Sequence, residues 1–118
     1  MGSRSAVALL QLPVRLHGIR LGQPTDLLLD DPAQRALGFV VLCGDDTERF
    51  LAYAAASLAE EEIGVESALM LLDDVNFYRE RAESLRALLG TAVEGGAVGD
   101  VLLDPDGSIA AVVASPDA

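Results

Sequence analysis

The sequence predicts a mainly β protein, built as a small β-barrel with one amphipathic helix and a second, incomplete barrel-like hairpin. A segment with two aspartates separated by three apolar residues occurs twice, over Gly22–Asp30 and Gly96–Asp104, and a turn and an apolar run follow each copy. Only Val75–Leu89 carries apolar residues at helical spacing. We therefore expect a barrel-like β domain over residues 8–72, a helix over 73–90 and a half repeat over 91–118.

The chain starts with a short apolar run, Ala6–Leu10, followed closely by Pro13 and Arg15. This run is too short to cross a bilayer, which takes about 20 apolar residues. It also lacks the small-residue cleavage site of a secretory signal peptide. We interpret this segment as a strand.

The first aspartate segment predicts a strand, a tight turn and a second strand. Gly22 supplies a turn or bulge before the strand, and three apolar residues between Asp26 and Asp30 are too few for a helix. The Asp30 carboxylate can accept hydrogen bonds from the backbone that follows it, so this residue is expected to begin the turn. The apolar run Leu37–Cys43 is the second strand.

Shorter strands are expected after this hairpin. Gly44–Thr47 has the composition of a turn, and Arg49–Tyr53 predicts a strand with Phe50 on one face and Leu51 and Tyr53 on the other. A further short strand is expected over Ile63–Ser67, after the acidic turn Glu60–Glu62.

The predicted helix begins at Asp73 or Asp74, which can cap it, and ends at Gly90. Its apolar stripe is expected to pack across the barrel or between the two halves. Adjacent aromatic residues cannot both be buried by one helix face, so either one is exposed for a partner or both are wedged against the barrel. The candidate interface residues are Phe77, Tyr78, Leu85 and Leu89.

The second aspartate segment carries the clearest hairpin signal. Gly96, Asp100 and Asp104 match the first copy, and Pro105-Asp106-Gly107 then leads into the apolar run Ile109–Ala114. Gly107 tolerates the positive φ that such a turn needs. A lone hairpin with an apolar face and open edges is marginal. We expect it either to pack on the first domain through the helix or to be completed by a second chain in a symmetric dimer.

This double hairpin resembles the PRC-barrel family, named for the cytoplasmic domain of the photosynthetic reaction-centre H subunit. The C-terminal domain of the ribosome maturation factor RimM is of the same type. The resemblance covers roughly residues 16–72 and 89–113, and it implies a small barrel that serves as a docking or assembly module without catalysis.

The charge balance argues against a nucleic-acid partner. The chain has 19 acidic and 8 basic residues, a formal charge of −11, and every basic residue is a scattered arginine. Phosphate backbones are bound by clustered basic side chains. We expect no nucleic-acid binding and no membrane span. The single cysteine, Cys43, lies in an apolar run, which favours a reduced, buried thiol and a cytoplasmic location.

Candidate chemistry is sparse. Acidic pairs such as Asp45-Asp46 and Asp73-Asp74 could ligate Ca²⁺ or Mg²⁺, but turn formation is the simpler explanation and no EF-hand spacing is present. His17 has no nucleophile-elbow context, and the glycines near Gly96 lead into a strand rather than a helix, unlike a phosphate cradle. We expect no catalytic residue, metal or cofactor.

The sequence therefore predicts a non-enzymatic module for protein binding, assembly or scaffolding, with an unknown protein partner and homodimerisation. A small-ligand or cation-responsive regulatory domain is the alternative, and a ribosome-maturation-like role is a further one.

Overall fold

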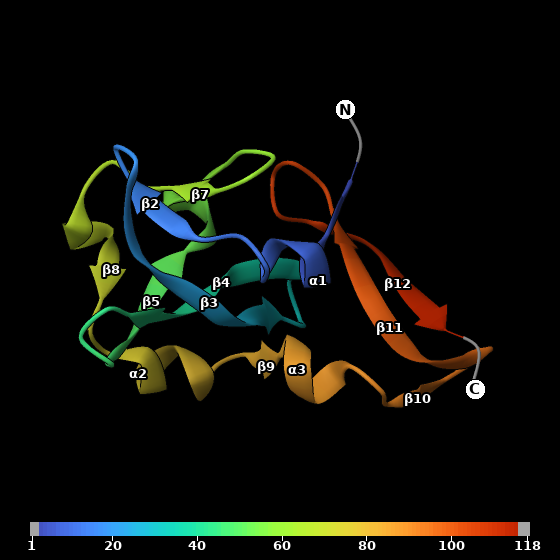
Figure 1. The fold of residues 1–118 in the computed structure, drawn as a ribbon. Coiled ribbons are helices and arrows are strands. Elements are labelled where there is room, and N and C mark those ends of the chain that lie inside the picture. The colour runs from blue at the N-terminus through green and yellow to red at the C-terminus, as the bar shows by residue number, and fades with distance from the viewer. Residues whose placement is uncertain (1–2, 116–118) are drawn as a thin grey trace.

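A computed structural model describes residues 3–115 of the chain (Figure 1). Strands dominate, as predicted, and form two sheets. The larger sheet has the strand order β6-β7-β2-β3-β4-β5-β8, with β9 paired to β3. Its strands are β2 (Val14–Leu16), β3 (Ile19–Asp30), β4 (Arg35–Cys43), β5 (Glu48–Ala52), β6 (Ser57–Leu58), β7 (Ile63–Gly64), β8 (Leu71–Leu72) and β9 (Glu83–Ser84).

The smaller sheet has four strands, with β11 paired to β1, β10 and β12. They are β1 (Arg4–Ser5), β10 (Ala92–Val93), β11 (Gly96–Leu103) and β12 (Ile109–Ser115). The helical segments are α1 (Ala6–Leu9), η1 (Tyr53–Ala55), η2 (Ala68–Met70), α2 (Val75–Arg79) and α3 (Leu85–Leu88).

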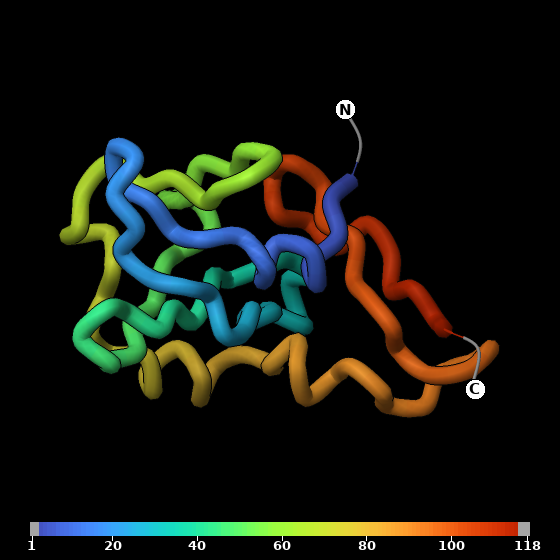
Figure 2. Tube along the Cα trace, in the orientation of Figure 1, coloured from blue at the N-terminus to red at the C-terminus, as the bar shows by residue number. Residues whose placement is uncertain are grey.

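The two long hairpins, β3–β4 and β11–β12, meet at their turns. Arg35 forms an isolated antiparallel bridge with Ser108, and the flanking hydrogen bonds join Ala36 N–H to Gly107 O at 2.7 Å and Ile109 N–H to Gln34 O at 2.8 Å. Beyond this bridge β4 continues beside β5, whereas β12 extends away from the larger sheet (Figures 1 and 2). No closed barrel forms in the described residues, which departs from the barrel expected from the sequence.

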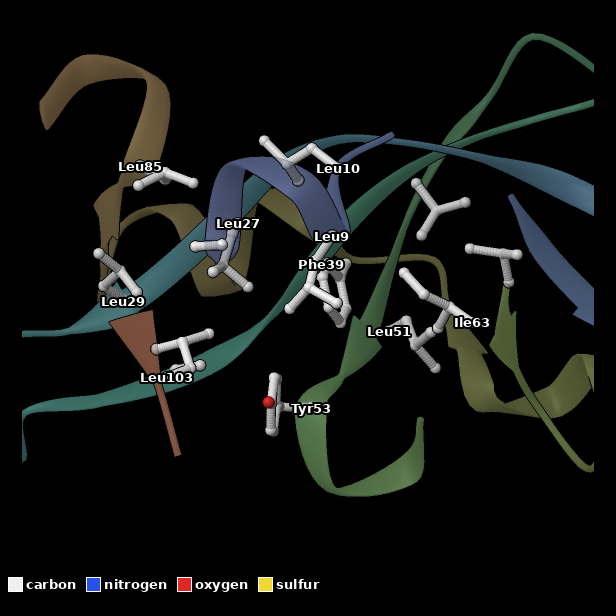
Figure 3. Packing of buried hydrophobic residues seen from close by; sticks show 14 of the residues in the cluster. Leu9, Leu10, Leu27, Leu29, Phe39, Leu51, Tyr53, Ile63, Leu85 and Leu103 are labelled. Carbon is white, nitrogen blue, oxygen red and sulfur yellow. The ribbon is translucent and has the colours of Figure 1, made fainter. Parts of the chain in front are cut away.

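The main core lies between the hairpins. Its side chains come from α1, β3, β4, α3 and β11, and include Leu9, Leu27, Phe39, Leu85 and Leu103 (Figure 3). The division into residues 8–72, 73–90 and 91–118 stays a prediction, but one core cluster contains side chains from all three ranges. The first turn of the chain and the second hairpin are thus held by the same apolar contacts.

A smaller cluster covers the other face of the larger sheet. Leu28, Val40 and Phe50 pack against Val75 of α2, and the Tyr78 ring stacks on the Phe50 ring at 3.8 Å between centroids. The faces predicted for Arg49–Tyr53 are confirmed, because Phe50 belongs to this cluster whereas Leu51 and Tyr53 belong to the main core, although Tyr53 begins η1 rather than ending β5.

The prediction of a single helix over Val75–Leu89 is wrong. α2 ends at Arg79, and the chain then becomes extended at β9, which pairs with Leu28 and Leu29 of β3 before α3 begins. Ser84 has φ −78° and ψ 129° and caps α3, so helical geometry cannot pass through it. Strand pairing to β3 therefore overrides the helical spacing of the sequence.

The strand predicted over Ala6–Leu10 is also wrong. Only Arg4–Ser5 is extended, and it pairs with Leu102–Leu103 of β11. Ser5 then caps α1, which buries Ala6 and Leu9. The strand predicted over Ile63–Ser67 is shorter than expected, since β7 ends at Gly64. None of the helices within residues 3–115 has the length and apolar character that crossing a membrane requires.

Candidate functional site: two aspartate clasps and a free strand edge

Asp26, the first aspartate of the first matching segment, holds the start of α3. The Ser84 hydroxyl donates to Asp26 Oδ2, and the backbone N–H of Arg86 donates to Asp26 Oδ1 at 3.1 Å. Oδ1 also accepts from the N–H of Leu27 at 2.9 Å, and Ser84 Oγ accepts from Ala87 N–H at 3.2 Å. This group joins residues 58 positions apart in the chain.

Asp100, the matching aspartate of the second segment, holds the start of α1 in the same way. The Ser5 hydroxyl donates to Asp100 Oδ2, and Val7 N–H donates to Asp100 Oδ1 at 3.0 Å. The N–H of Val101 donates to Oδ1 at 2.7 Å, and Ser5 Oγ accepts from Ala8 N–H at 3.1 Å. We call the Asp26–Ser84 and Asp100–Ser5 groups the two aspartate clasps.

The hairpins around the clasps agree in register as well. β3–β4 has irregularities between Pro24 and Asp26 and between Leu28 and Leu29. The β11–β12 hairpin has them at the corresponding places, between Val98 and Asp100 and between Leu102 and Leu103. The two short strands that carry the clasp serines also pair at matching positions of the hairpins. Ser84 of β9 pairs with Leu28, and Ser5 of β1 pairs with the corresponding Leu102. Each hairpin thus receives the capped helix that precedes the other hairpin in the chain.

Sequence reasoning missed the two serines. A signal for them is present, because Ser5–Leu10 reads SAVALL and Ser84–Leu89 reads SLRALL, so serine, alanine and two leucines share the same spacing. Both serines accept a hydrogen bond from the third residue beyond them, as a helix cap does.

The other predicted motif residues act in turns and close contacts. Asp30 accepts from Ala33 N–H at 3.2 Å and so begins its turn as expected. At the second turn the carboxylate that accepts is that of Asp106, from Ser108 N–H at 2.9 Å, while Asp104 contributes its backbone carbonyl to Gly107 N–H at 2.8 Å. The N–H of Ser108 lowers the pKa of the Asp106 carboxyl.

The predicted glycines serve different purposes. Gly107 has a φ of 91°, which confirms the turn geometry expected there. Gly22 is not in a turn: it lies within β3, next to a register irregularity in the pairing with β2, where a Cβ would stand 2.5 Å from the carbonyl oxygen of Leu42. Gly96 begins β11 at a φ of 143°, directly after the turn residue Gly95.

The two hairpins differ at one edge. β4 has β5 on the side away from β3, whereas within residues 3–115 β12 is paired only to β11, and the isolated bridge at Ser108 lies just before it. Val112 and Val113 of β12 pair with Val101 and Asp100 of β11. Phe39 and Val40 of β4 pair with the matching residues of β3, so the two valines occupy the equivalent places. Phe39 and Val40 have no exposed surface, while Val112 is 49% and Val113 37% exposed.

This β12 edge is unprotected. Among the strands of five or more residues in the described part of the chain, β12 alone is paired along one side (Figure 1). The strand, Ile109–Ser115, has no charged residue and no proline, the usual devices that keep a free edge from pairing. The β12 edge is therefore the candidate binding surface.

The predicted interface residues lie in different environments. Phe77 is 44% exposed, and the guanidinium of Arg81 stands 3.7 Å from its ring centre, whereas Tyr78 packs on Phe50. Leu85 is fully buried and so cannot contact a partner, whereas Leu89 is partly buried against the main core. Of the four, Phe77 alone has a substantially exposed aromatic ring.

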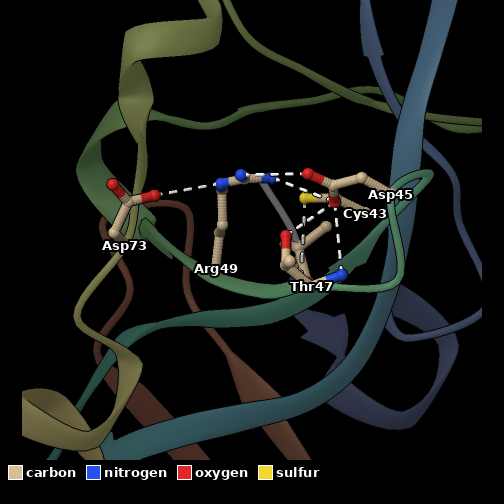
Figure 4. Close-up of polar contacts among 6 residues, drawn as sticks. Cys43, Asp45, Thr47, Arg49 and Asp73 are labelled. Atoms are coloured by element: carbon tan, nitrogen blue, oxygen red, sulfur yellow. Dashed lines mark hydrogen bonds and ion pairs between the residues drawn. The ribbon is translucent and has the colours of Figure 1, made fainter.

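A polar cluster (Figure 4) surrounds the turn between β4 and β5, which lies at the opposite end of the molecule from β12 (Figure 1). The Arg49 guanidinium forms ion pairs with the carboxylates of Asp45 and Asp73, each at 3.1 Å between nitrogen and oxygen, beside the buried Cys43. The Thr47 hydroxyl donates to Asp45 at 2.6 Å and, together with Arg49, holds the pKa of Asp45 well below its usual range. These carboxylates raise the pKa of Arg49. The cluster borders a cavity of about 580 Å³.

A second cavity, of about 750 Å³, lies between η1 and the turn of the second hairpin. Arg4, Tyr53 and Asp106 contribute its polar groups, and Leu58 and Pro105 are among its apolar ones. Burial raises the pKa of the Tyr53 phenol. Arg4 donates to the carbonyl of Ala59 at 2.6 Å, which fixes its guanidinium at the rim.

Residues 3–115 contain no group of three or more His, Cys, Asp or Glu side chains arranged to hold a metal ion. His17 lies in the exposed turn between β2 and β3, with a φ of 49° beside Gly18 at 82°. No protein-family model matches the chain, and no curated protein resembles it closely enough in sequence to indicate a relative.

Proposed function

We propose that this protein is a non-catalytic assembly module of the PRC-barrel type, which binds another protein by adding a strand to the β12 edge. The observation that carries the proposal is the contrast between the two hairpins. Where β4 is covered by β5, the matching strand β12 carries exposed valines and no charge.

The matching clasps support an internal duplication. Each half then consists of a serine-capped short helix followed by a hairpin with an aspartate, and each half gives its helix to the other's hairpin. In such a duplication the third strand beside β4 has an equivalent position beside β12. An added strand at that position would complete the second half in the same way.

Strand addition also suits the chemistry of the edge. Main-chain N–H and C=O groups along a free edge supply binding energy that does not depend on the partner's side chains. Val112 and Val113 lie on opposite faces of β12, so a docked strand would shield apolar surface on both faces. Each buried methylene contributes about 0.8 kcal/mol.

Several side chains with catalytic potential are engaged in contacts within the protein. Asp26 and Asp100 bond serine hydroxyls and backbone N–H groups, and Arg49 is shared between two carboxylates. This use of the polar groups favours a binding role over an enzymatic one.

Site-specific photo-crosslinking in the cells of origin tests the proposal. A photoreactive residue at Val113 is expected to form a crosslinked protein product, because in the cell a partner strand is paired with the β12 edge. The control is Leu69 of η2, which is 86% exposed and lies beside β8 at the other end of the molecule. Absence of any protein product at Val113, or equal products at Val113 and Leu69, would contradict a binding role for β12.

A second candidate is a small-ligand regulatory domain, and the cavity of about 750 Å³ beside Tyr53 favours it. A ligand that binds only the folded protein raises its melting temperature. In a thermal-shift screen of metabolites, a ligand of this cavity is expected to lose its effect in an Arg4→Gln variant. A ligand whose effect is unchanged in that variant would bind elsewhere.

A further inference from the structure

We propose that the strand added to the β12 edge is β12 of a second copy of this chain. The two strands pair antiparallel about a two-fold axis that passes through the sheet near Val112 and Val113. This inference rests on the proposed function, and it names the partner that the edge accepts.

Antiparallel self-pairing preserves the two faces of the sheet. A two-fold axis perpendicular to the sheet places each residue opposite one of the same orientation in the other copy. Val112 lies opposite Val101 of β11, whose side chain belongs to the main core, while Val113 lies opposite Asp100 on the other face. The core-facing side of one copy thus continues into that of the other, and the two four-stranded sheets join into one.

Charge favours this edge for self-association. Each copy carries a formal charge of −11, so most contacts between two copies bring like charges together. The β12 strand carries none of these charges. Two copies can therefore approach along β12 without placing carboxylates of the paired strands opposite one another.

The side chains of β12 also select the kind of strand that fits. By register, Ala111 stands where β4 has Gly38, and a Cβ at Gly38 would overlap the carbonyl oxygen of Leu51 and lie 2.5 Å from Phe50 Cζ. On β5, Ala52 lies opposite Gly38 and Phe50 lies opposite Val40, so both the β5 backbone at Leu51 and the Phe50 ring come close to Gly38. Because β12 has alanine at this position, its partner strand cannot come as close as β5 comes to β4, and the partner β12 offers small side chains, with alanines at 110, 111 and 114.

Sedimentation velocity of the full chain over a wide concentration range tests the pairing. Wild type is expected to form dimers, and Val112→Lys and Val113→Lys are each expected to weaken the dimer by at least about tenfold, because two copies of the new charge face each other across the axis. Leu69→Lys is the matched control, since it adds the same charge to an exposed apolar position at the other end, and it is expected to dimerise as wild type does.

Cysteine crosslinking gives a second measurement. Val112→Cys or Val113→Cys is expected to form a disulfide-linked dimer on mild oxidation, whereas Leu69→Cys is not. Both β12 positions are partly exposed in the single chain, so these variants keep the fold, and circular dichroism verifies it. Wild type that stays monomeric, or lysine variants that dimerise as tightly as wild type, would overturn the inference.

The two proposals fail in different ways. A monomeric wild type that still forms a product with another protein at Val113 in cells overturns self-pairing and leaves the assembly role in place. A monomeric wild type with no product at Val113 overturns both.

Discussion

Single carboxylates carry much of the long-range order of this protein. Asp26 and Asp100 each accept from a serine hydroxyl and from two backbone N–H groups, and so fix a helix start against a strand that is distant in the chain. Hydrogen bonds to an ionised acceptor are stronger than those between neutral groups. Asp45 works over a shorter range, because its partners Thr47 and Arg49 belong to the same turn and the strand that follows.

Asp45 leads to a prediction at the scale of the residue. Its pKa is lowered in the folded protein, chiefly by the Thr47 hydroxyl and then by Arg49, so its charged form stabilises the fold. This contribution is complete above the ordinary carboxyl pKa of about 4 and is lost as the pH falls through the folded-state pKa. Asp45→Asn is therefore expected to unfold at lower urea concentration than wild type at neutral pH, with a difference that shrinks at acidic pH.

Urea unfolding midpoints measured from neutral to acidic pH check this, with Glu61→Gln as the charge-matched control at an exposed turn position. If the difference in urea midpoint between wild type and Asp45→Asn grew as the pH fell, the charged form of Asp45 would not be the form that stabilises the fold.

At the scale of the element, tertiary contacts decide what the short segments become. The helical spacing of Val75–Leu89 is real, yet the segment contains two helices and a strand pair, because Glu83 and Ser84 hydrogen-bond as β9 to β3. The N-terminal apolar run is a helix for the same reason, since Ser5 pairs with Leu102 and caps α1. Periodicity indicated helical structure within Val75–Leu89, but it did not predict β9 there, nor the helix α1 at the N-terminal run.

The clasp at Asp26 leads to a prediction for these elements. Ser84→Ala removes both the bond to Asp26 and the cap of α3, and it is expected to cost about 1–2 kcal/mol of the free energy of unfolding. Asp26→Asn is expected to weaken the same contact, so the double variant should lose less than the two single losses together, with a coupling of about 0.5–3 kcal/mol. Chemical denaturation of the four proteins measures this double-mutant cycle.

The control cycle pairs Ser84→Ala with Asp100→Asn, which belongs to the other clasp. The two changes share no bonded partner in the clasps, so their effects are expected to add within about 0.5 kcal/mol. Equal coupling in both cycles would show that the measured energy does not come from the Asp26–Ser84 contact.

At the scale of the whole molecule, the protein is an elongated body of 41 × 31 × 27 Å with chemically different ends. One end holds the Arg49 cluster and the exposed Leu69, and the other end is formed by the second hairpin with its free edge (Figure 1). The net negative charge opposes the association of two copies, and β12 carries no charged residue that would add to this repulsion at close range.

This distribution predicts how salt affects the proposed dimer. Long-range repulsion between two copies of charge −11 is screened over about 10 Å at 0.1 M salt. The dimer is therefore expected to tighten as salt is raised, because strand pairing and apolar contact do not depend on attraction between opposite charges. Sedimentation at low and high sodium chloride checks this, and a dimer that weakens with salt would indicate an interface built on ion pairs.

The sequence by itself determined the features that depend on neighbouring residues. It predicted a mainly β chain, the turns at Asp30 and Gly107, the two faces of β5 and the matching aspartate segments, because turn geometry and alternation act over a few residues. Only the tertiary structure decided that each serine reaches the aspartate of the other hairpin, and that β12 lacks the neighbour that β4 has. Those contacts join residues 58 and 95 positions apart, and their energy exists only once the core between them has formed.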